Sequence, residues 1–219
     1  HNTMPFTIDG KLRSGVFELE GDVSSQYVTG LLFALPLLDG DSEIRMLSKL
    51  ESKPYVDLTI ACLRHFGIAV QETEQGYAVA GGQQYHACDL TVEGDYSQAA
   101  FFCVANALGS DITLTNLNPE SVQGDKKIVE IVREMCYNRE QGLPAGFTVD
   151  AADIPDLVPI LAVLATFGTA PSSITGAHRL AIKESDRLAS TADLLNRLGG
   201  KVTATPDGLE IEPVEQLHG

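Results

Sequence analysis

The chain has 219 residues, of which 44% are hydrophobic and 21% charged, and its 30 Asp and Glu outnumber 15 Lys and Arg to give a net charge of −15. This is the composition of an ordinary globular protein, and it excludes long disordered or fibrous segments. The acidity argues against nucleic acid as a partner, because binding to a phosphate backbone draws on clustered basic charge. A small anionic ligand remains compatible, since it responds to the local field of a pocket.

We expect a cytoplasmic protein with neither a membrane span nor a metal site. The longest apolar runs, Val28 to Leu38 and Leu157 to Phe167, are each about half of the ~20 residues that a membrane-spanning helix needs. The start, His1 to Met4, has no basic or apolar stretch typical of a secretory signal. The four cysteines show no CxxC spacing, which indicates reduced thiols instead of a disulfide framework or a zinc site.

Three segments of the chain share one layout of short strands and helices. In the first segment, a polar turn at Gly21 to Gln26 leads into an apolar helix, and an amphipathic helix follows after a short strand. The predicted elements of this first unit are strand Val16 to Leu19, helix Tyr27 to Ala34, strand Ser42 to Met46, helix Pro54 to Phe66, and strands Ile68 to Gln71 and Tyr77 to Ala80.

The same order recurs twice, so the pattern β-α-β-α-β-β is predicted three times. The middle copy is degenerate, because its second helix lacks a glycine C-cap such as Gly67 or Gly199. Its predicted elements are strand Asp89 to Val92, helix Ala99 to Val104, strand Asp111 to Thr115 and helix Gly124 to Cys136. Those of the last copy are strand Phe147 to Val149, helix Leu157 to Ala162, strand Ser172 to Thr175, helix Glu184 to Leu198, and strands Lys201 to Thr205 and Leu209 to Ile211.

The first helix of each unit has almost no polar face, so we expect it inside a domain. A right-handed crossover places such a helix on one face of a sheet, and packing the units about these inner helices would cover the other side. The helix N-termini would then lie together and offer free N–H groups to an anion without basic residues.

Two motifs in the first unit have both a structural and a functional interpretation. Ser24-Ser25-Gln26 either caps the first apolar helix or binds a phosphate or carboxylate with its hydroxyls and amide. In Ser52-Lys53-Pro54-Tyr55-Val56-Asp57, Ser52 suits a cap and Pro54 the first turn. Lys53 stands at the positive end of the helix dipole, which indicates that an anion is bound or paired nearby.

Two motifs in the last unit are ambiguous in the same way. Asp153-Ile154-Pro155-Asp156 either forms a capping arrangement with Asp153 as the cap, or provides Asp156 as a general base. Lys183-Glu184-Ser185-Asp186-Arg187 places two cations four residues apart on one predicted helix face. That face is either a solvated surface with Lys183–Asp186 and Glu184–Arg187 pairs, or a cation clamp on a substrate anion beside a carboxyl acid.

No nucleotide cofactor is supported, because neither a GxxxxGK[ST] loop nor a GxGxxG turn occurs. We therefore predict a reaction without a cofactor.

Taken together, the motifs resemble the 5-enolpyruvylshikimate-3-phosphate synthase family (3-phosphoshikimate 1-carboxyvinyltransferases). Five motifs carry the resemblance, and their order and spacing match those of the family along almost the whole chain. They are Gly21-Asp22-Val23-Ser24-Ser25-Gln26, Ser52-Lys53-Pro54-Tyr55-Val56-Asp57, Val92-Glu93-Gly94-Asp95, Asp153-Ile154-Pro155-Asp156 and Lys183-Glu184-Ser185-Asp186-Arg187. A relative of the UDP-N-acetylglucosamine enolpyruvyl transferases is the alternative, since these share the repeat, but the second and fifth motifs resemble the shikimate enzyme.

The resemblance implies a mixed α/β fold, the inside-out α/β barrel of the enolpyruvyl transferases, built from βαβαββ repeats. On this basis residues 1–86 are the last repeat of a first domain, and residues 87–219 are two repeats of a second domain. The chain is then an internal part of a longer enzyme that is monomeric at full length.

The implied reaction transfers the enolpyruvyl group of phosphoenolpyruvate to the 5-hydroxyl of shikimate 3-phosphate and releases phosphate. Asp156 would bind the shikimate hydroxyls and take the 5-hydroxyl proton, while Glu184, with Lys183 as a second acid/base candidate, would protonate the methylene carbon. Arg187 would bind phosphoenolpyruvate, and Gln26 would contact both substrates. The remaining implied substrate-binding residues are Ser24, Ser25, Ser52, Tyr55 and Arg179, the last standing where many family members carry Asn.

Other motifs of the family do not occur in these 219 residues: its N-terminal Lys-Ser and Arg, its glycine-rich loop, and its C-terminal His-Arg and Lys. We therefore expect part of the phosphoenolpyruvate pocket to be missing and the chain alone to be inactive. A substrate-binding module without chemistry is the second hypothesis.

Overall fold

The computed structural model describes residues 7–219, so the His1 to Met4 segment lies outside the described residues. The chain forms two compact units. The first comprises His1–Leu50 and Thr59–Asp89, and the second comprises Glu51–Leu58 and Leu90–Gly219. The short segment Glu51–Leu58, which contains the start of one helix, therefore belongs with the second unit.

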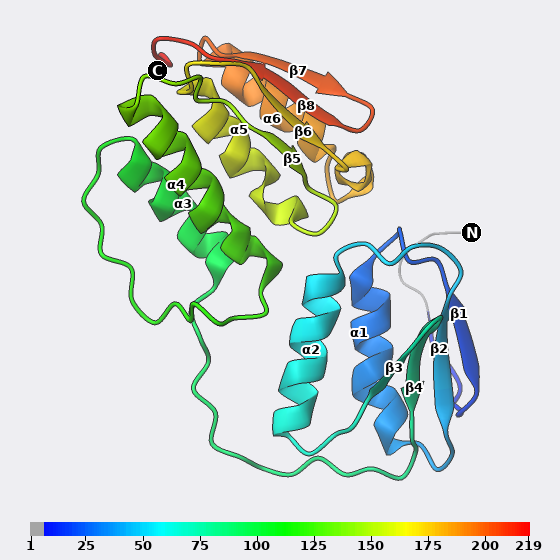
Figure 1. The fold of residues 1–219 in the computed structure, drawn as a ribbon. Coiled ribbons are helices and arrows are strands. Elements are labelled where there is room, and N and C mark those ends of the chain that lie inside the picture. Colours follow the sequence, from blue (N-terminus) through cyan, green and yellow to red (C-terminus); the bar gives the residue numbers. More distant parts are fainter. Residues whose placement is uncertain (1–6) are drawn as a thin grey trace. The chain divides into compact units, whose positions relative to one another are not determined.

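The first unit contains one four-stranded sheet with the strand order β1-β2-β4-β3 (Figure 1). β1 and β2 are parallel, and the remaining pairs are antiparallel. Ile44 of β2 pairs with Tyr77 of β4, and both side chains are buried. The elements of this unit are β1 (Val16–Leu19), α1 (Ser25–Ala34), the 3-10 helix η1 (Leu35–Leu37), β2 (Ser42–Met46), the part of α2 (Lys53–His65) that begins at Thr59, β3 (Gln71–Thr73) and β4 (Gly76–Val79).

The second unit ends in a sheet of the same topology, with the order β5-β6-β8-β7 and one parallel pair, β5 with β6. Two helices, α5 and α6, pack against this sheet and against each other. The elements are β5 (Thr148–Asp150), the 3-10 helix η3 (Pro155–Leu157), α5 (Val158–Thr166), β6 (Ser172–Thr175), the 3-10 helix η4 (His178–Ile182), α6 (Arg187–Arg197), β7 (Lys201–Thr205) and β8 (Gly208–Glu212).

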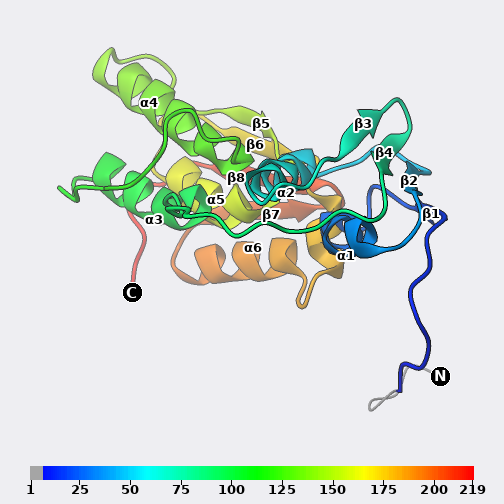
Figure 2. The ribbon, with the colours of Figure 1, turned by 90° about the horizontal axis from the view of Figure 1, so that it is seen from below.

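The middle segment differs from its prediction, because residues 89–92 and 111–115 form no strands. The two stretches are joined by single contacts: the Gly94 N–H donates to the Asn116 carbonyl, and the Asn116 side chain donates to the Val92 carbonyl. The described residues here form two helices, α3 (Tyr96–Ala107) and α4 (Lys127–Glu140), with the 3-10 helix η2 (Gly124–Lys126) before α4. Both views show α3 beside α4 (Figures 1 and 2).

Only one of the three apolar helices is enclosed as predicted. Most of α5 is buried, and it is the centre of a core shared with α3, α4 and the β5–β8 sheet. By contrast, α1 exposes Tyr27 and Phe33, and α3 exposes Phe101 and Phe102. For α1 and α3 the prediction of complete burial was therefore wrong, because the described residues place neighbours on only part of each helix surface.

Among residues 7–219, no helix is both long and apolar enough to cross a membrane. The same residues contain no group of three or more His, Cys, Asp or Glu side chains arranged to hold a metal ion.

Candidate active site

The chemically active side chains of the second unit gather on short, irregular segments. These are the start of α2, the 3-10 helices η2 and η3, and the chain from η4 to the first turn of α6. Gly124 allows the first three to approach, because a Cβ atom there would lie 2.9 Å from both the Asp153 carbonyl oxygen and a Pro54 side-chain carbon. A larger residue at position 124 would force these segments apart.

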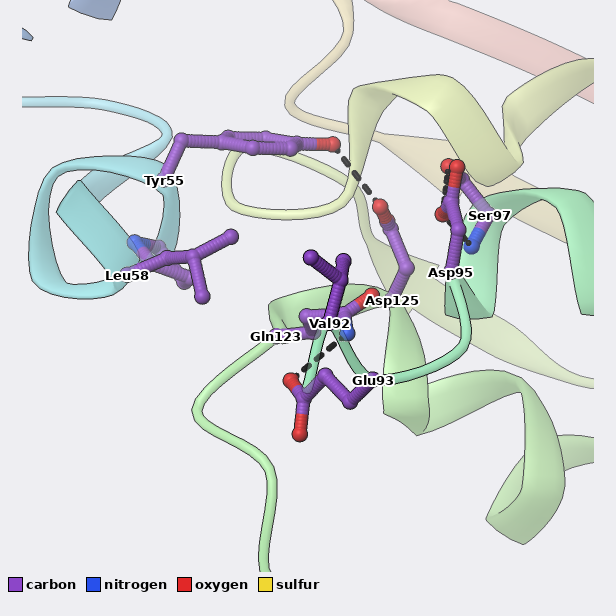
Figure 3. Close-up of a pocket in the computed structure, with 9 residues that line it drawn as sticks. Tyr55, Leu58, Val92, Glu93, Asp95, Ser97, Gln123 and Asp125 are labelled. Carbon is purple, nitrogen blue, oxygen red and sulfur yellow. Dashed lines mark hydrogen bonds between the residues drawn. The ribbon is translucent and has the colours of Figure 1, made fainter. Parts of the chain in front are cut away.

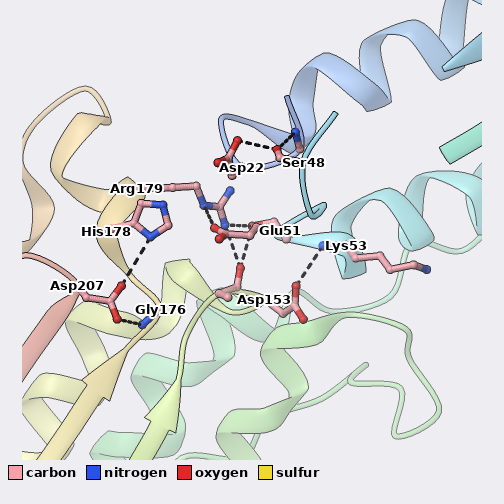
Figure 4. A network of polar contacts seen from close by, with 12 residues as sticks. Asp22, Ser48, Glu51, Lys53, Asp153, Gly176, His178, Arg179 and Asp207 are labelled. Atoms are coloured by element: carbon pink, nitrogen blue, oxygen red, sulfur yellow. Dashed lines mark hydrogen bonds and ion pairs between the residues drawn. The ribbon is translucent and has the colours of Figure 1, made fainter. Parts of the chain in front are cut away.

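A buried arginine anchors the segment that precedes α2 (Figure 4). Arg179 is only 3% exposed, and its Nε lies 2.5 Å from the Glu51 carboxylate. Its Nη2 donates to the Ser52 hydroxyl at 2.8 Å and to the Ala152 carbonyl at 2.9 Å. Ser52 has a φ of +56°, a backbone conformation that non-glycine residues rarely adopt. Arg179 thus holds Ser52, and the strained turn that contains it, against the loop before η3.

The hydroxyl of Tyr55 lies between two carboxylates. Its oxygen is 2.9 Å from Oδ2 of Asp125 and 3.2 Å from Oδ2 of Asp156; Figure 3 shows the contact with Asp125. Burial, and then the two carboxylates, raise the pKa of Tyr55, so this phenol keeps its proton at neutral pH. Burial likewise raises the pKa of Asp125 to about 6.

Arg187 joins two carboxylates that are accessible from solvent. Its Nη1 donates to Asp156 Oδ1 at 2.9 Å, and its Nε and Nη2 donate to Glu184 at 2.9 and 3.2 Å. The hydrogen bonds from Arg187 lower the pKa of Glu184, so this carboxyl is ionised at neutral pH. The side chains of Asp156, Arg187 and Glu184 all retain exposed surface. A bound anion would have to compete with these carboxylates for the guanidinium.

A cavity of about 320 Å³ adjoins Tyr55 and Asp125. Its walls are mostly apolar surface with a few polar groups, and Figure 3 shows Tyr55, Leu58 and Val92 around it. The polar side chains are engaged with their neighbours: Gln123 donates to Glu93, and Asp95 accepts from Ser97. The lining residues are Pro54, Tyr55, Leu58, Val92, Glu93, Asp95, Ser97, Gln123 and Asp125.

The Lys183–Arg187 segment is not helical as predicted. The backbone of Lys183 is extended, and α6 begins only at Arg187 with Asp186 as its N-cap. The Asp186 side chain accepts from the Ala189 N–H at 2.9 Å and so determines where the helix starts. Lys183 and Arg187 therefore do not form a pair on one helix face, whereas the expected Glu184–Arg187 pair is present.

The predicted capping by Asp153 was also wrong. η3 has no side-chain cap, and α5 starts at Val158, after this 3-10 turn. The Asp153 carboxylate instead accepts from the Lys53 N–H at 3.3 Å. The anion expected near Lys53 is Asp57, whose carboxylate lies 2.6 Å from Nζ.

The Ser24-Ser25-Gln26 motif belongs to the first unit. Ser24 is the N-cap of α1, and its hydroxyl accepts from the Gln26 N–H at 3.3 Å, as the capping interpretation predicted. Two preceding residues stabilise this turn. The Ser48 hydroxyl donates to Asp22 at 2.9 Å (Figure 4), and Gly21 packs closely against the backbone of Lys49 and Leu50.

Sequence reasoning missed two acids of the second unit: Glu51, whose side chain is only 14% exposed, and Asp125, which is buried. Glu51 immediately precedes a motif that was recognised, and Asp125 lies in Gln123-Gly124-Asp125, directly before α4. An available signal for Asp125 was an acidic residue next to a glycine at a helix start. That signal is also typical of an ordinary helix cap, and only its burial in the folded structure distinguishes Asp125 from such a cap.

The comparisons with known proteins agree on one family. The family model described as EPSP synthase (3-phosphoshikimate 1-carboxyvinyltransferase) matches residues 1–219. A 3-phosphoshikimate 1-carboxyvinyltransferase of Clostridium kluyveri is 45% identical over 226 residues, covering 99% of this chain and 53% of the relative. The enzyme of the same name from Clostridium novyi is 43% identical, and the match covers 100% of this chain and 53% of that enzyme. The chain thus spans about half the length of the curated relatives that it matches.

Solved structures share the fold. An EPSP synthase from Acinetobacter baumannii superimposes with a TM-score of 0.71 at 24% identity, covering 94% of this chain and 50% of that one. The enolpyruvyl transferase NikO from Streptomyces tendae gives a TM-score of 0.60 at 17% identity, over 93% of this chain and 52% of its own. With a family model that covers every residue and curated relatives above 40% identity, the chain belongs to the EPSP synthase family.

Proposed function

We propose that this chain is part of an enzyme that transfers the enolpyruvyl group of phosphoenolpyruvate to the 5-hydroxyl of shikimate 3-phosphate. The observation that carries the proposal is the bridge through Arg187 between Asp156 and Glu184. The reaction needs one group that removes a proton from the attacking hydroxyl and another that delivers a proton to the methylene carbon of the enol. Two accessible carboxylates held by one guanidinium provide such a pair within a single unit.

In this proposal Asp156 accepts the proton of the 5-hydroxyl. Glu184 is ionised while Arg187 is bonded to it; it takes up a proton when Arg187 turns to phosphoenolpyruvate and then delivers that proton to the methylene carbon, with Lys183 as a second acid/base candidate. Arg187 binds the carboxylate or phosphate of phosphoenolpyruvate, because a guanidinium matches either group bidentately. On the shikimate 3-phosphate side, Tyr55 and Ser52 bind the ring or phosphate. The polar groups assigned to the same substrates in the first unit are Ser24, Ser25 and Gln26.

The role of Arg179 is revised within this proposal. Its guanidinium is buried and already bonded to Glu51, Ser52 and Ala152, so it acts on the substrate through the position of Ser52. Direct contact with shikimate 3-phosphate would require it to give up one of these bonds.

We further propose that residues 1–86 are the last repeat of one enolpyruvyl transferase domain, and that 87–219 are two repeats of a second inside-out α/β barrel. The matching topology of the β1–β4 and β5–β8 sheets supports two of the three repeats. The middle repeat is supported by its helices alone.

The first experiment is titration calorimetry of the chain with shikimate 3-phosphate and phosphoenolpyruvate, each alone and together. We expect shikimate 3-phosphate to bind, and Asp156→Asn to weaken it about tenfold or more, because a hydrogen bond to a charged group contributes about 1.5–3 kcal/mol. Asp193→Asn, an exposed carboxylate of α6, is the matched control. Equal affinity of the two variants would contradict the proposed site.

The second measurement is phosphate release with both substrates. We expect negligible turnover, since the chain spans about half the length of its relatives and misplaced catalytic groups cost orders of magnitude. Binding of shikimate 3-phosphate that phosphoenolpyruvate never strengthens would favour the second hypothesis, a binding module without chemistry.

A further inference from the structure

The Tyr55 hydroxyl has one proton and two carboxylate neighbours. Its oxygen is within hydrogen-bonding distance of both Asp125 and Asp156. A phenol hydroxyl donates a single hydrogen bond. If both carboxyls were ionised, one of the two contacts would bring two oxygen lone pairs together without a proton between them. The geometry therefore favours one additional proton shared among these three residues.

Asp125 is the residue suited to hold that proton. It is 3% exposed, and within residues 7–219 its Oδ1 has no hydrogen-bond partner. An unpartnered buried oxygen costs less as the carbonyl of a neutral acid than as part of a carboxylate. Burial raises the pKa of Asp125 to about 6, against the opposing effect of its hydrogen bond with Tyr55.

The charged groups around Asp125 act in the same direction. Asp156 of η3 and Asp95 at the start of α3 both contribute, after burial, to the raised pKa of Asp125. The nearby cations are engaged elsewhere: Arg187 pairs with Asp156 and Glu184, and Lys126 donates to the carbonyls of Pro119 and Ser121. The remaining acid that lines the cavity, Glu93, is hydrogen-bonded to Ser121 and Gln123.

We propose that Asp125 is a positioning residue that aims the Tyr55 hydroxyl and so controls whether Asp156 Oδ2 is open to a substrate hydroxyl. When Asp125 is ionised, Tyr55 donates to it, and Asp156 Oδ2 is left to accept from the substrate. When Asp125 takes a proton from solvent, it donates to the Tyr55 oxygen, and Tyr55 then donates to Asp156. Only the substrate-binding consequence rests on the function proposed above for Asp156.

The direct test is carbon-13 NMR of the tyrosine ring. The Cζ resonance of Tyr55, assigned through bonds in the wild-type chain, is followed between pH 4.5 and 8 (about 1.5 to 2 units around the expected midpoint). We expect an inflection near pH 6, since the hydroxyl changes partner as Asp125 titrates. It should disappear in Asp125→Asn, which cannot ionise, and persist in Asp57→Asn, a carboxylate on the same helix that pairs with Lys53.

A wild-type Tyr55 resonance without an inflection would overturn the inference, whether or not any variant folds. So would an inflection that survives in a folded Asp125→Asn chain. A merely structural role for Asp125 would change stability but would give Tyr55 no titration at this pH.

The second test measures shikimate 3-phosphate affinity of wild type and Asp125→Asn across the same pH range. A phosphate monoester itself titrates near pH 6, so the readout is the ratio of the two affinities at each pH. In Asp125→Asn the Tyr55 hydroxyl is drawn to Asp156 at every pH. We expect the wild type to bind at least threefold more tightly above pH 7, with the ratio falling toward one below pH 5.

The two proposals fail separately. If shikimate 3-phosphate does not bind, the proposed function of this site fails, while the Tyr55 titration still decides the role of Asp125. If it binds with a ratio that does not change with pH, the positioning of Asp156 by Asp125 is wrong and the proposed function stands.

Discussion

Arg179 is a buried cation whose charge is matched by the Glu51 carboxylate. The desolvation of such a pair is costly, and the pair is tolerated because hydrogen bonds to Ser52 and Ala152 satisfy the rest of the guanidinium. Exposed pairs such as Arg197–Asp193 differ, because water screens both partners. Loss of the arginine should therefore reduce stability far more at position 179 than at position 197.

We expect Arg179→Met to destabilise the chain by about 3–5 kcal/mol, since it leaves the mostly enclosed Glu51 carboxylate without its partner. Arg197→Met, the matched control, should change stability by less than about 1 kcal/mol. Urea denaturation of the two variants measures both effects. Equal stability of the two variants would show that the ion pair has no structural role. A double variant, Arg179→Met with Glu51→Gln, should recover part of the lost stability. If it recovers none, the loss in Arg179→Met comes from packing and not from the unpaired Glu51 carboxylate.

At the scale of elements, the position of the helix starts decides which groups can meet. α6 begins at Arg187 because the Asp186 side chain satisfies the Ala189 N–H, which leaves Lys183 and Glu184 outside the helix. Glu184 is then free to turn back onto Arg187, three residues later. α3 starts in the same way, since Asp95 accepts from the N–H groups of Ser97 and Gln98.

We expect Asp186→Ala to cost about 1 kcal/mol, the usual effect of losing an N-cap. The free energy of unfolding from urea denaturation gives this value directly. Asp193→Ala, in the interior of the same helix, is the control and should have a smaller effect. If Asp186→Ala is as stable as the wild type, Asp186 does not cap α6, and a helix start at Glu184, as the sequence predicted, would fit better.

At the scale of the molecule, residues 80–95 join β4 to α3 without a helix or strand. The first part of this connection is held to the first unit, because the Tyr85 hydroxyl donates to the Phe33 carbonyl and the His86 N–H to the Phe66 carbonyl. The part from residue 87 to residue 92 is exposed throughout. The division into two compact units falls within this exposed stretch, between Asp89 and Leu90.

Limited proteolysis with thermolysin should therefore cut first next to Leu90 and Val92, both of which are exposed. Mass spectrometry of the early fragments identifies the cleaved bond. Leu209, fully buried in β8, offers the same bond chemistry and should be cut only after unfolding. First cleavage within β7 or β8 would contradict the division into units.

Much of the fold could be predicted from residue patterns. Strands β1, β2, β6 and β7 have the predicted bounds, because alternation and β-branching are local properties of the chain. The predicted strands at residues 89–92 and 111–115 were wrong. A strand needs a ladder of hydrogen bonds to a partner, and the bonds from Gly94 to Asn116 and from the Asn116 side chain to Val92 do not form one.

The candidate site was predictable only where a motif marked it. The residues Tyr55, Asp156, Glu184 and Arg187 follow from short signatures, and the structure brings these four together in the second unit. Glu51 and Asp125 could not be identified in this way, because nothing local distinguishes a buried carboxyl from a solvated one.

The sequence by itself determined the family, many of the local elements and the chemical types of residue available, because each of these is carried by neighbouring residues along the chain. Only the tertiary structure decided which carboxyls are buried, which oxygens lie within hydrogen-bonding distance of one another and where Arg187 and Arg179 find their partners. Burial and charge pairing depend on segments that lie about a hundred residues apart, as Tyr55 and Asp156 do. Those are the properties that shift a pKa and position a proton.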